Sequence, residues 1–199
     1  SGDLSEHFKP IGDNNNYYFQ GTFDGRGHTI SNLAMNSSLK YAGLFGRSTV
    51  TTIKNVVLDS SCSVMTPFSD LNRVYGGGII GECDELCVIE NTVNMAIVAF
   101  TESVGSVSNL YLGGVAGRLY AFGGSPVMKN CANYGSIECS GTVGSYVNIG
   151  GVAGYSGGSA IQNCLNYGEI THNGTTPNYL YIGGILGCAW SSSILIENC

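Results

Sequence analysis

One short stretch of the sequence holds the residue types of an acid–base site. Residues 19–33, FQGTFDGRGHTISNL, place Asp24, Arg26 and His28 at alternate positions. A carboxylate, a cation and an imidazole could together abstract a proton, as in a lyase that acts on polysaccharides. The same stretch contains three glycines, and glycine with aspartate is typical of a turn whose carboxylate accepts backbone hydrogen bonds. We interpret it as a turn between the first strands, and we predict no catalytic residue in the chain.

An acidic run, Glu82-Cys83-Asp84-Glu85, is the second candidate for a functional site. Its carboxylates could bind calcium, which takes oxygen ligands. However, the sequence shows no spaced array of oxygen ligands elsewhere. We therefore interpret the run as a solvated loop closed by a bond between Cys83 and Cys87, and we predict neither a metal site nor a cofactor.

The chain contains eight cysteines, a number that requires an explanation. None has the paired C-x-x-C spacing of a zinc knuckle, and the three histidines are scattered, so zinc is disfavoured against disulfides in an oxidising compartment. Free thiols are the remaining alternative. The disulfide candidates, whose connectivity the sequence leaves open, are Cys62, Cys83, Cys87, Cys131, Cys139, Cys164, Cys188 and Cys199.

Two sequons and the overall composition indicate a secreted or cell-surface protein. Asn36 and Asn173 each begin an N-x-S/T triplet and are candidate N-glycosylation sites. The net charge is −6 and no Lys or Arg follows Lys129, which argues against nucleic acid as a partner, and we predict none. No apolar run reaches the length of a membrane span. The sequence begins with Ser1 and not with Met, so we expect a segment of a longer chain.

A glycine motif recurs through the chain and must position all of these residues. It reads AGLFG at 42–46, GGIIG at 77–81, GGVAG at 113–117 and 150–154, and GGILG at 183–187. Its second residue advances by 35, 36, 37 and 33 positions. A period in this range is the signature of a solenoid, and the short β-branched segments between glycines are typical of strands.

These repeats predict the fold class and the domain organisation. We expect an all-β, parallel β-helix or β-solenoid of about five to six coils, right-handed, with a period of 33–37 residues. The whole of 1–199 would be one domain. Its expected parts are a lead-in at 1–40, repeats at 41–73, 74–110, 111–146 and 147–179, and a partial last repeat at 180–199 that continues in a longer parent chain.

A second motif, I-x-N or M-x-N, follows each glycine motif by about ten residues. Stacked from coil to coil, its amides can bond one another, as in the asparagine ladders of cross-β assemblies. The predicted ladder consists of Asn32, Asn55, Asn91, Asn130, Asn163 and Asn198. Cysteine follows the asparagine three times, and stacking would place Cys131 and Cys164 about 5 Å apart, close enough for a disulfide.

The glycine motif followed by I-x-N-C resembles the GLUG repeat of large secreted and surface proteins. These include adhesins and the non-catalytic parts of IgA-specific metallopeptidases. The opening segments FKPIG at 8–12 and FQGTFDGRGHTI at 19–30 are similar to the lead-in of such arrays. The resemblance covers most of residues 8–199 and implies a parallel β-solenoid. No catalytic motif of these proteins is present, and H-E-x-x-H in particular does not occur in the sequence.

These observations favour a non-enzymatic, extracellular structural or adhesive repeat protein. A variant of this interpretation is a subunit or segment of a surface filament, whose coil edges would be covered end to end by another copy or by neighbouring repeats of a longer chain.

Two alternatives are kept. The first is a glycan-binding module, which the twelve tyrosines favour if a row of them lies on an outer face. Tyrosines pointing inward would argue against it. The second is a polysaccharide lyase or hydrolase, which would need two or more carboxylates gathered with Lys or Arg in one groove.

Overall fold

The chain folds into a stack of short parallel strands. The structure is a computed structural model, and it describes residues 8–12, 16–36, 39–66, 72–101, 107–175 and 177–199. Every strand pairing between named strands is parallel, and the described residues contain no helix. In particular, they contain no helix of the length and hydrophobicity that would cross a membrane.

Four sheets, here called A to D, run along the stack. Sheet A contains β1 (Phe19–Asp24), β5 (Phe45–Lys54), β9 (Ile80–Glu90), β13 (Ala116–Tyr120), β14 (Val127–Lys129), β18 (Ala153–Ser156), β19 (Ala160–Gln162), β23 (Leu186–Ala189) and β24 (Leu195–Glu197). Sheet B contains β2 (Thr29–Ile30), β6 (Val57–Leu58), β10 (Val93–Asn94), β15 (Ala132–Asn133) and β20 (Leu165–Asn166).

The other two sheets also have five strands each. Sheet C contains β3 (Ala34–Asn36), β7 (Ser63–Met65), β11 (Ile97–Phe100), β16 (Ile137–Cys139) and β21 (Ile170–His172). Sheet D contains β4 (Tyr41–Ala42), β8 (Arg73–Gly77), β12 (Val107–Gly113), β17 (Val143–Gly150) and β22 (Tyr179–Gly183).

The predicted fold class is confirmed, with a smaller number of turns. The chain forms a parallel β-solenoid of about 4 turns, fewer than the five to six predicted. The lead-in joins the stack, because β1, β2 and β3 pair in parallel with β5, β6 and β7. Before β1, Ile11 makes a parallel bridge to Phe45.

The strand register agrees with the repeat spacing. In sheet D, Tyr41 pairs with Tyr75, Tyr75 with Tyr111, Tyr111 with Asn148, and Asn148 with Tyr181. Equivalent positions of the glycine motif therefore lie directly above one another.

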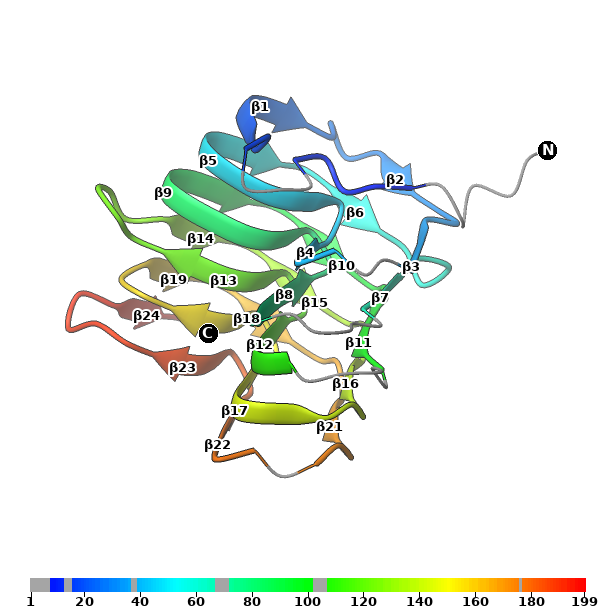
Figure 1. The fold of residues 1–199 in the computed structure, drawn as a ribbon. Coiled ribbons are helices and arrows are strands. Elements are labelled where there is room, and N and C mark those ends of the chain that lie inside the picture. The colour runs from blue at the N-terminus through cyan, green and yellow to red at the C-terminus, as the bar shows by residue number, and fades with distance from the viewer. Residues whose placement is uncertain (1–7, 13–15, 37–38, 67–71, 102–106, 176) are drawn as a thin grey trace.

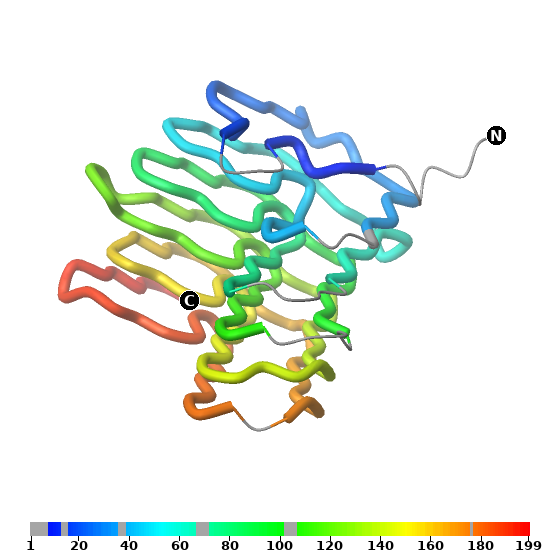
Figure 2. The backbone as a smooth tube through the Cα atoms, in the orientation of Figure 1, coloured from blue at the N-terminus to red at the C-terminus, as the bar shows by residue number. Residues whose placement is uncertain are grey.

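Each turn has two arms, which Figures 1 and 2 show as separate stacks. In one arm sheet A runs outward and then folds back, and the long strands β5 and β9 make this bend without a break. Its core contains Ile80 from the outward part and Ile89 from the returning part. The other arm packs sheet C against sheet D, with Val98 and Leu110 in its core. The outer angle between sheets D and A forms a concave corner along the stack.

The double glycine stands at this corner because there is no room for a side chain. A Cβ on Gly113 would lie 2.0 Å from the carbonyl oxygen of Ala116. A Cβ on Gly114 would lie 2.1 Å from the amide carbon of Asn133. The first glycine therefore lets the backbone turn closely, and the second makes space for an asparagine of sheet B.

That asparagine belongs to an inner ladder that the sequence analysis did not predict. The Asn94 Nδ2 donates to Asn133 Oδ1 at 2.9 Å, and Asn133 Nδ2 donates to Asn166 Oδ1 at 2.9 Å. Asn94 and Asn133 are fully buried. In the first turn Leu44 and Leu58 replace the Gly–Asn pair and join the hydrophobic core.

The predicted outer asparagine ladder is present as hydrogen bonds at five positions. Each amide donates to the preceding turn, over 3.3 Å for Asn91 to Asn55, 3.1 Å for Asn130 to Asn91, 3.1 Å for Asn163 to Asn130, and 3.3 Å for Asn198 to Asn163. All five have φ between 52° and 56°, the left-handed conformation that asparagine tolerates best after glycine.

Asn32 does not belong to this ladder, which corrects the prediction. It has the same left-handed φ of 56°, but β2 pairs with β6 and so places it beside sheet B. Its backbone N–H donates to Ser61 Oγ. The end of the ladder is Asp24, whose Oδ1 accepts from Asn55 Nδ2 at 2.9 Å.

The cysteines lie mostly in the interior, and all eight are thiols in the structure. Cys131 and Cys164 occupy equivalent positions in adjacent turns, and the Cys164 N–H donates to Cys199 Sγ at 3.3 Å. The stacking that the sequence predicts is therefore present. A disulfide between any of the eight stays a prediction.

The two ends of the solenoid differ. Phe8 packs against both hydrophobic cores at the N-terminal end. At the other end, Ile182 is 48% exposed, whereas Ile149, its partner in the preceding turn, is fully buried. The same holds for Ile196 and its buried partner Ile161. The last turn thus presents an apolar edge of core residues.

Candidate functional site

The concave corner between sheets D and A contains a cavity of about 580 Å³, here called the groove. Its lining includes the cations Lys40, Arg47, Arg73 and Arg118, the carboxylates Glu82, Asp84 and Glu85, and the rings of Tyr18, Tyr41, Tyr75, Tyr120 and Phe122. Four of the eight basic residues of the chain therefore surround one cavity, although the chain as a whole is acidic.

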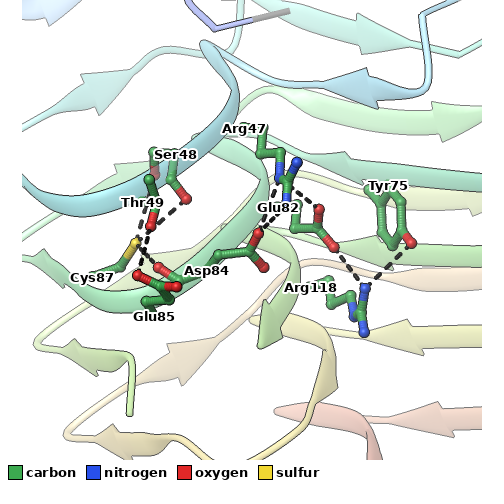
Figure 3. A network of polar contacts seen from close by, with 9 residues as sticks. All are labelled: Arg47, Ser48, Thr49, Tyr75, Glu82, Asp84, Glu85, Cys87 and Arg118. Carbon is green, nitrogen blue, oxygen red and sulfur yellow. Dashed lines mark hydrogen bonds and ion pairs between the residues drawn. The ribbon is translucent and has the colours of Figure 1, made fainter. Parts of the chain in front are cut away.

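A column of alternating charge forms one wall of the groove. Arg47 of β5 pairs in register with Glu82 of β9, which pairs with Arg118 of β13. Glu82 forms ion pairs with both neighbours, with Oε1 2.7 Å from Arg118 Nη1 and Oε2 3.1 Å from Arg47 Nε (Figure 3). Asp84, two residues along β9, also forms an ion pair with Arg47.

This burial overturns the predicted solvated loop. Glu82 is 3% exposed and Asp84 is 8% exposed, and both lie within strand β9. Burial raises the pKa of Glu82 above its ordinary value, the nearby Asp84 adds to the rise, and Arg118 and Arg47 oppose it. The carboxylates are stable here because neighbouring turns supply a guanidinium on each side.

A stack of tyrosine rings forms the other wall. The ring centroids of Tyr41 and Tyr75 are 5.2 Å apart, and those of Tyr75 and Tyr111 are 5.0 Å apart, with nearly parallel planes. Tyr41 and Tyr75 are buried, yet neither belongs to the two hydrophobic cores. Burial raises the pKa of Tyr75 to about 12. Tyr41 and Tyr75 are therefore packing residues of the wall. Aromatic rings that face outward, as a glycan-binding surface requires, must be supplied by other residues.

Arg118 lies among four tyrosines. Its guanidinium carbon is 3.9 Å from the ring centroid of Tyr120, 5.4 Å from that of Tyr155, 5.6 Å from that of Tyr75 and 5.9 Å from that of Tyr111. A cation held over aromatic faces in this way is fixed in place. The wall is thus preorganised.

The remaining two cations of the groove are not neutralised in the same way. Lys40 Nζ lies 5.0 Å from the ring centroid of Tyr41. Within the described part of the chain, neither Lys40 nor Arg73 forms an ion pair with a carboxylate. Glu85 accepts a hydrogen bond from Thr49 at 3.3 Å.

A second cavity, of about 220 Å³, shares Arg73 with the groove. We call it the aromatic pocket, and its lining includes Asn109, Tyr146, Tyr181 and Trp190. The Tyr146 ring stacks on Tyr179 with centroids 4.7 Å apart. A glycan-binding module was expected to present aromatic rings on an outer face. Tyr41 and Tyr75 are buried and do not, whereas Trp190 in this pocket is 74% exposed.

The first catalytic candidates lie outside the groove. Asp24 Oδ1 accepts from the backbone N–H of Arg26 at 2.9 Å, and the N–H of His28 donates to the carbonyl of Gly25 at 2.8 Å. These are the contacts of a turn, as the sequence interpretation stated. None of the three candidate side chains lines either cavity.

The two predicted glycosylation sites lie outside both cavities. Asn173 is exposed after β21, and Asn36 ends β3, with its backbone paired to Met65. Whether either carries a glycan stays a prediction. The residues that the structure describes include no group of three or more His, Cys, Asp or Glu that could hold a metal ion.

A simple sequence signal could have located the groove. The residue directly after each glycine motif is, in chain order, Arg47, Glu82, Arg118, Tyr155 and Cys188. Sheet A aligns these five positions in one column. Alternating charge at a fixed place in the repeat therefore indicates a charged wall once the fold is known to be a solenoid.

The groove gathers three carboxylates with Lys and Arg side chains, the arrangement that the lyase or hydrolase alternative requires, but arginines hold two of these carboxylates. Both oxygens of Glu82 are bonded to guanidinium groups, and Asp84 is bonded to Arg47. A general acid must deliver a proton to the substrate, and a carboxyl group held between two arginines is poorly placed to do so. Aromatic faces and cations without a carboxylate partner, such as Arg73, are in contrast suited to recognition.

Comparison with known proteins supports the fold. No protein family matches the sequence, and no curated protein matches it. The structure is similar to a crystal structure described as "a putative immunoglobulin A1 protease from Bacteroides ovatus", with a TM-score of 0.58 and 18% sequence identity. The match covers 97% of this chain and 63% of that one, so this chain corresponds to less than two thirds of its structural neighbour. At this identity the likeness concerns the fold alone.

Proposed function

We propose that the chain is a non-enzymatic, adhesive segment of an extracellular or cell-surface protein, and that its groove binds a glycan. The observation that carries this proposal is the cavity of about 580 Å³ whose walls combine cations, carboxylates and aromatic rings. Sugars offer hydroxyl groups to charged side chains and an apolar ring face to aromatic ones. Pockets with a few fixed polar groups beside aromatic surface are the usual form of such sites.

The wall is rigid, which favours binding. Arg118 is bonded to Glu82 and packed on Tyr120, and Glu82 is bonded to Arg47 in turn. A ligand that meets such a wall does not have to order it first, so less of its binding free energy is lost. Phe122 lies at the edge of the groove and is 74% exposed, which makes it available to the ring of a sugar.

The open edge of the last turn supports the structural part of the proposal. Ile182 and Ile196 are half exposed. Their partners in the preceding turn, Ile149 and Ile161, are fully buried. Apolar strand edges of this kind pair with further strands. We propose that neighbouring repeats or a second copy cover this edge, so that the groove is displayed on a longer array.

A glycan array tests the binding function. We expect the intact chain to bind a defined subset of immobilised glycans. Phe122→Ala should weaken that binding about tenfold, a loss of about 1.4 kcal/mol in binding free energy, because it removes an aromatic face from the groove. Tyr167→Ala is the matched control, because Tyr167 is exposed, aromatic and outside both cavities. The absence of binding to every neutral and acidic glycan would contradict the proposal.

A further inference from the structure

We infer that the groove and the aromatic pocket form one extended site for a carboxylated oligosaccharide, a chain that contains uronic or sialic acid. This inference rests on the proposed function and specifies its ligand. Three observations carry it: the cations that remain after the internal ion pairs are formed, the column of side chains that joins the two cavities, and the aromatic surface at the end of that column.

The charge balance of the groove favours an anionic ligand. Glu82 and Asp84 are taken up by Arg47 and Arg118. Lys40 and Arg73 remain, and within the described residues the salt bridges do not include them. Glu85 is the third carboxylate of the lining. Arg73 is exposed and contacts the Tyr75 hydroxyl, and the remaining N–H groups of its guanidinium can bind a carboxylate.

Arg73 also begins a column of four side chains that leads into the aromatic pocket. It pairs in register with Asn109, Asn109 pairs with Tyr146, and Tyr146 pairs with Tyr179. Adjacent strands are ~4.8 Å apart, so the column offers one group per turn along the stack. The order is a cation, an amide and two stacked rings, which corresponds to the carboxylate, the hydroxyl groups and the ring face of an acidic sugar chain.

The amide of this column has unused hydrogen-bonding capacity. Asn109 Oδ1 is buried and has no hydrogen-bond partner among the described residues. Buried polar atoms without a partner are rare in folded proteins, and a ligand is one of the explanations for them. A sugar hydroxyl that reaches the pocket after a small movement of Asn109 would satisfy this oxygen.

Trp190 provides a direct reporter of occupancy. It lines the aromatic pocket and is the single tryptophan of the chain. We would titrate the intact chain with oligogalacturonate and record its fluorescence, with calorimetry in parallel. The matched neutral ligand is the methyl ester of the same oligosaccharide, which keeps the sugar and removes the charge. Sialyllactose with lactose as its neutral match forms a second arm, which separates sialic acid from uronic acid.

We expect one of the two acids to change Trp190 fluorescence saturably and its neutral match to bind at least about tenfold more weakly, as the loss of a charge-assisted hydrogen bond implies. Arg73→Gln should weaken the acid about tenfold. Arg26→Gln is the matched control, because Arg26 is also exposed but lines neither cavity, and it should bind like the native chain.

Three outcomes would overturn the inference, and they are distinguishable. Equal binding of acid and neutral match would leave glycan binding intact and refute the acidic ligand. Calorimetric binding with no response from Trp190 would confine the ligand to the groove and refute the extended site. Equally tight binding of polyglutamate would point to acidic peptides and refute a sugar-specific site. If no glycan binds at all, the proposed function fails together with the inference.

Discussion

Glu82 and Arg118 form an ion pair across two adjacent turns of the solenoid, with 2.7 Å between Oε1 and Nη1. The two residues are 36 positions apart in the sequence, and the register of β9 and β13 brings them together. Glu82 is at the same time bonded to Arg47 on its other side. The pair thus fixes the wall of the groove, and several measurable properties depend on it.

Removal of Arg118 should destabilise the protein strongly. Arg118→Met leaves Glu82 buried with one cation in place of two, so we expect a loss in the free energy of unfolding of up to the ~3–5 kcal/mol that an uncompensated buried charge costs. Urea unfolding followed by circular dichroism measures the loss. The double variant Arg118→Met with Glu82→Gln should recover part of it, and equal losses in the single and double variants would contradict the account.

Stability should fall at alkaline pH because Tyr75 is buried in its protonated form. Its pKa is raised from 10.0 to about 12. In the unfolded chain the phenol loses its proton near pH 10, and in the folded chain only near pH 12. The stabilisation is therefore complete below pH 10 and is lost as the pH rises from 10 to 12.

Urea unfolding at pH 8, 10 and 11 measures this dependence. Tyr75→Phe should give a shallower decline of the free energy of unfolding between pH 10 and 11 than the native chain. Tyr179→Phe is the matched control, because Tyr179 is exposed, and it should decline like the native chain. A slope unchanged by Tyr75→Phe would show that burial of this phenol does not govern alkaline stability.

The fold could be predicted from the sequence because its signals are local and repeated. Five glycine motifs at nearly equal spacing are sufficient for a solenoid, and the structure explains them through the close contacts of residues such as Gly113 with the backbone. The outer asparagines were found for the same reason. Asn32 was wrongly included because its local sequence matches that of the other asparagines, and its backbone conformation is the same as theirs. Its position in the stack is different, because β2 pairs with β6 of sheet B.

The groove could not be predicted in the same way. Arg47, Glu82 and Arg118 stand in different repeats, and each differs from the residue at the same place in the next repeat. Their association becomes visible only when the repeats are stacked in the register that the glycine motif sets, because no single repeat contains the charged column. The acidic run at 82–85 appeared solvated because buried carboxylates are rare, and its partners come from other turns.

The inner asparagine ladder should be as important for stability as the core. Asn133→Ala removes a buried amide that donates to Asn166 and accepts from Asn94, and it leaves both neighbours with an unmade hydrogen bond. We expect a loss of about 2–4 kcal/mol in the free energy of unfolding. Thermal unfolding measured by calorimetry checks this value, and a loss below 1 kcal/mol would refute the assignment.

The outer ladder allows backbone conformation to be separated from hydrogen bonding. Asn130 has a φ of 54° and is bonded to Asn91 and Asn163. Asn130→Ala should cost about 1–2 kcal/mol for the left-handed conformation in addition to the lost bonds. Asn130→Gly loses the same bonds without that strain, so it should be the more stable variant. If alanine is tolerated as well as glycine, the conformational argument fails.

The most direct test of the binding site is a crystal structure of the chain in complex with the glycan that it binds most tightly on the array. We expect sugar rings in the groove, in contact with Phe122 and within hydrogen-bonding distance of Lys40 or Arg73. Density for the glycan on any other face, with the groove unoccupied, would contradict the central claim that this corner of the solenoid is its binding site.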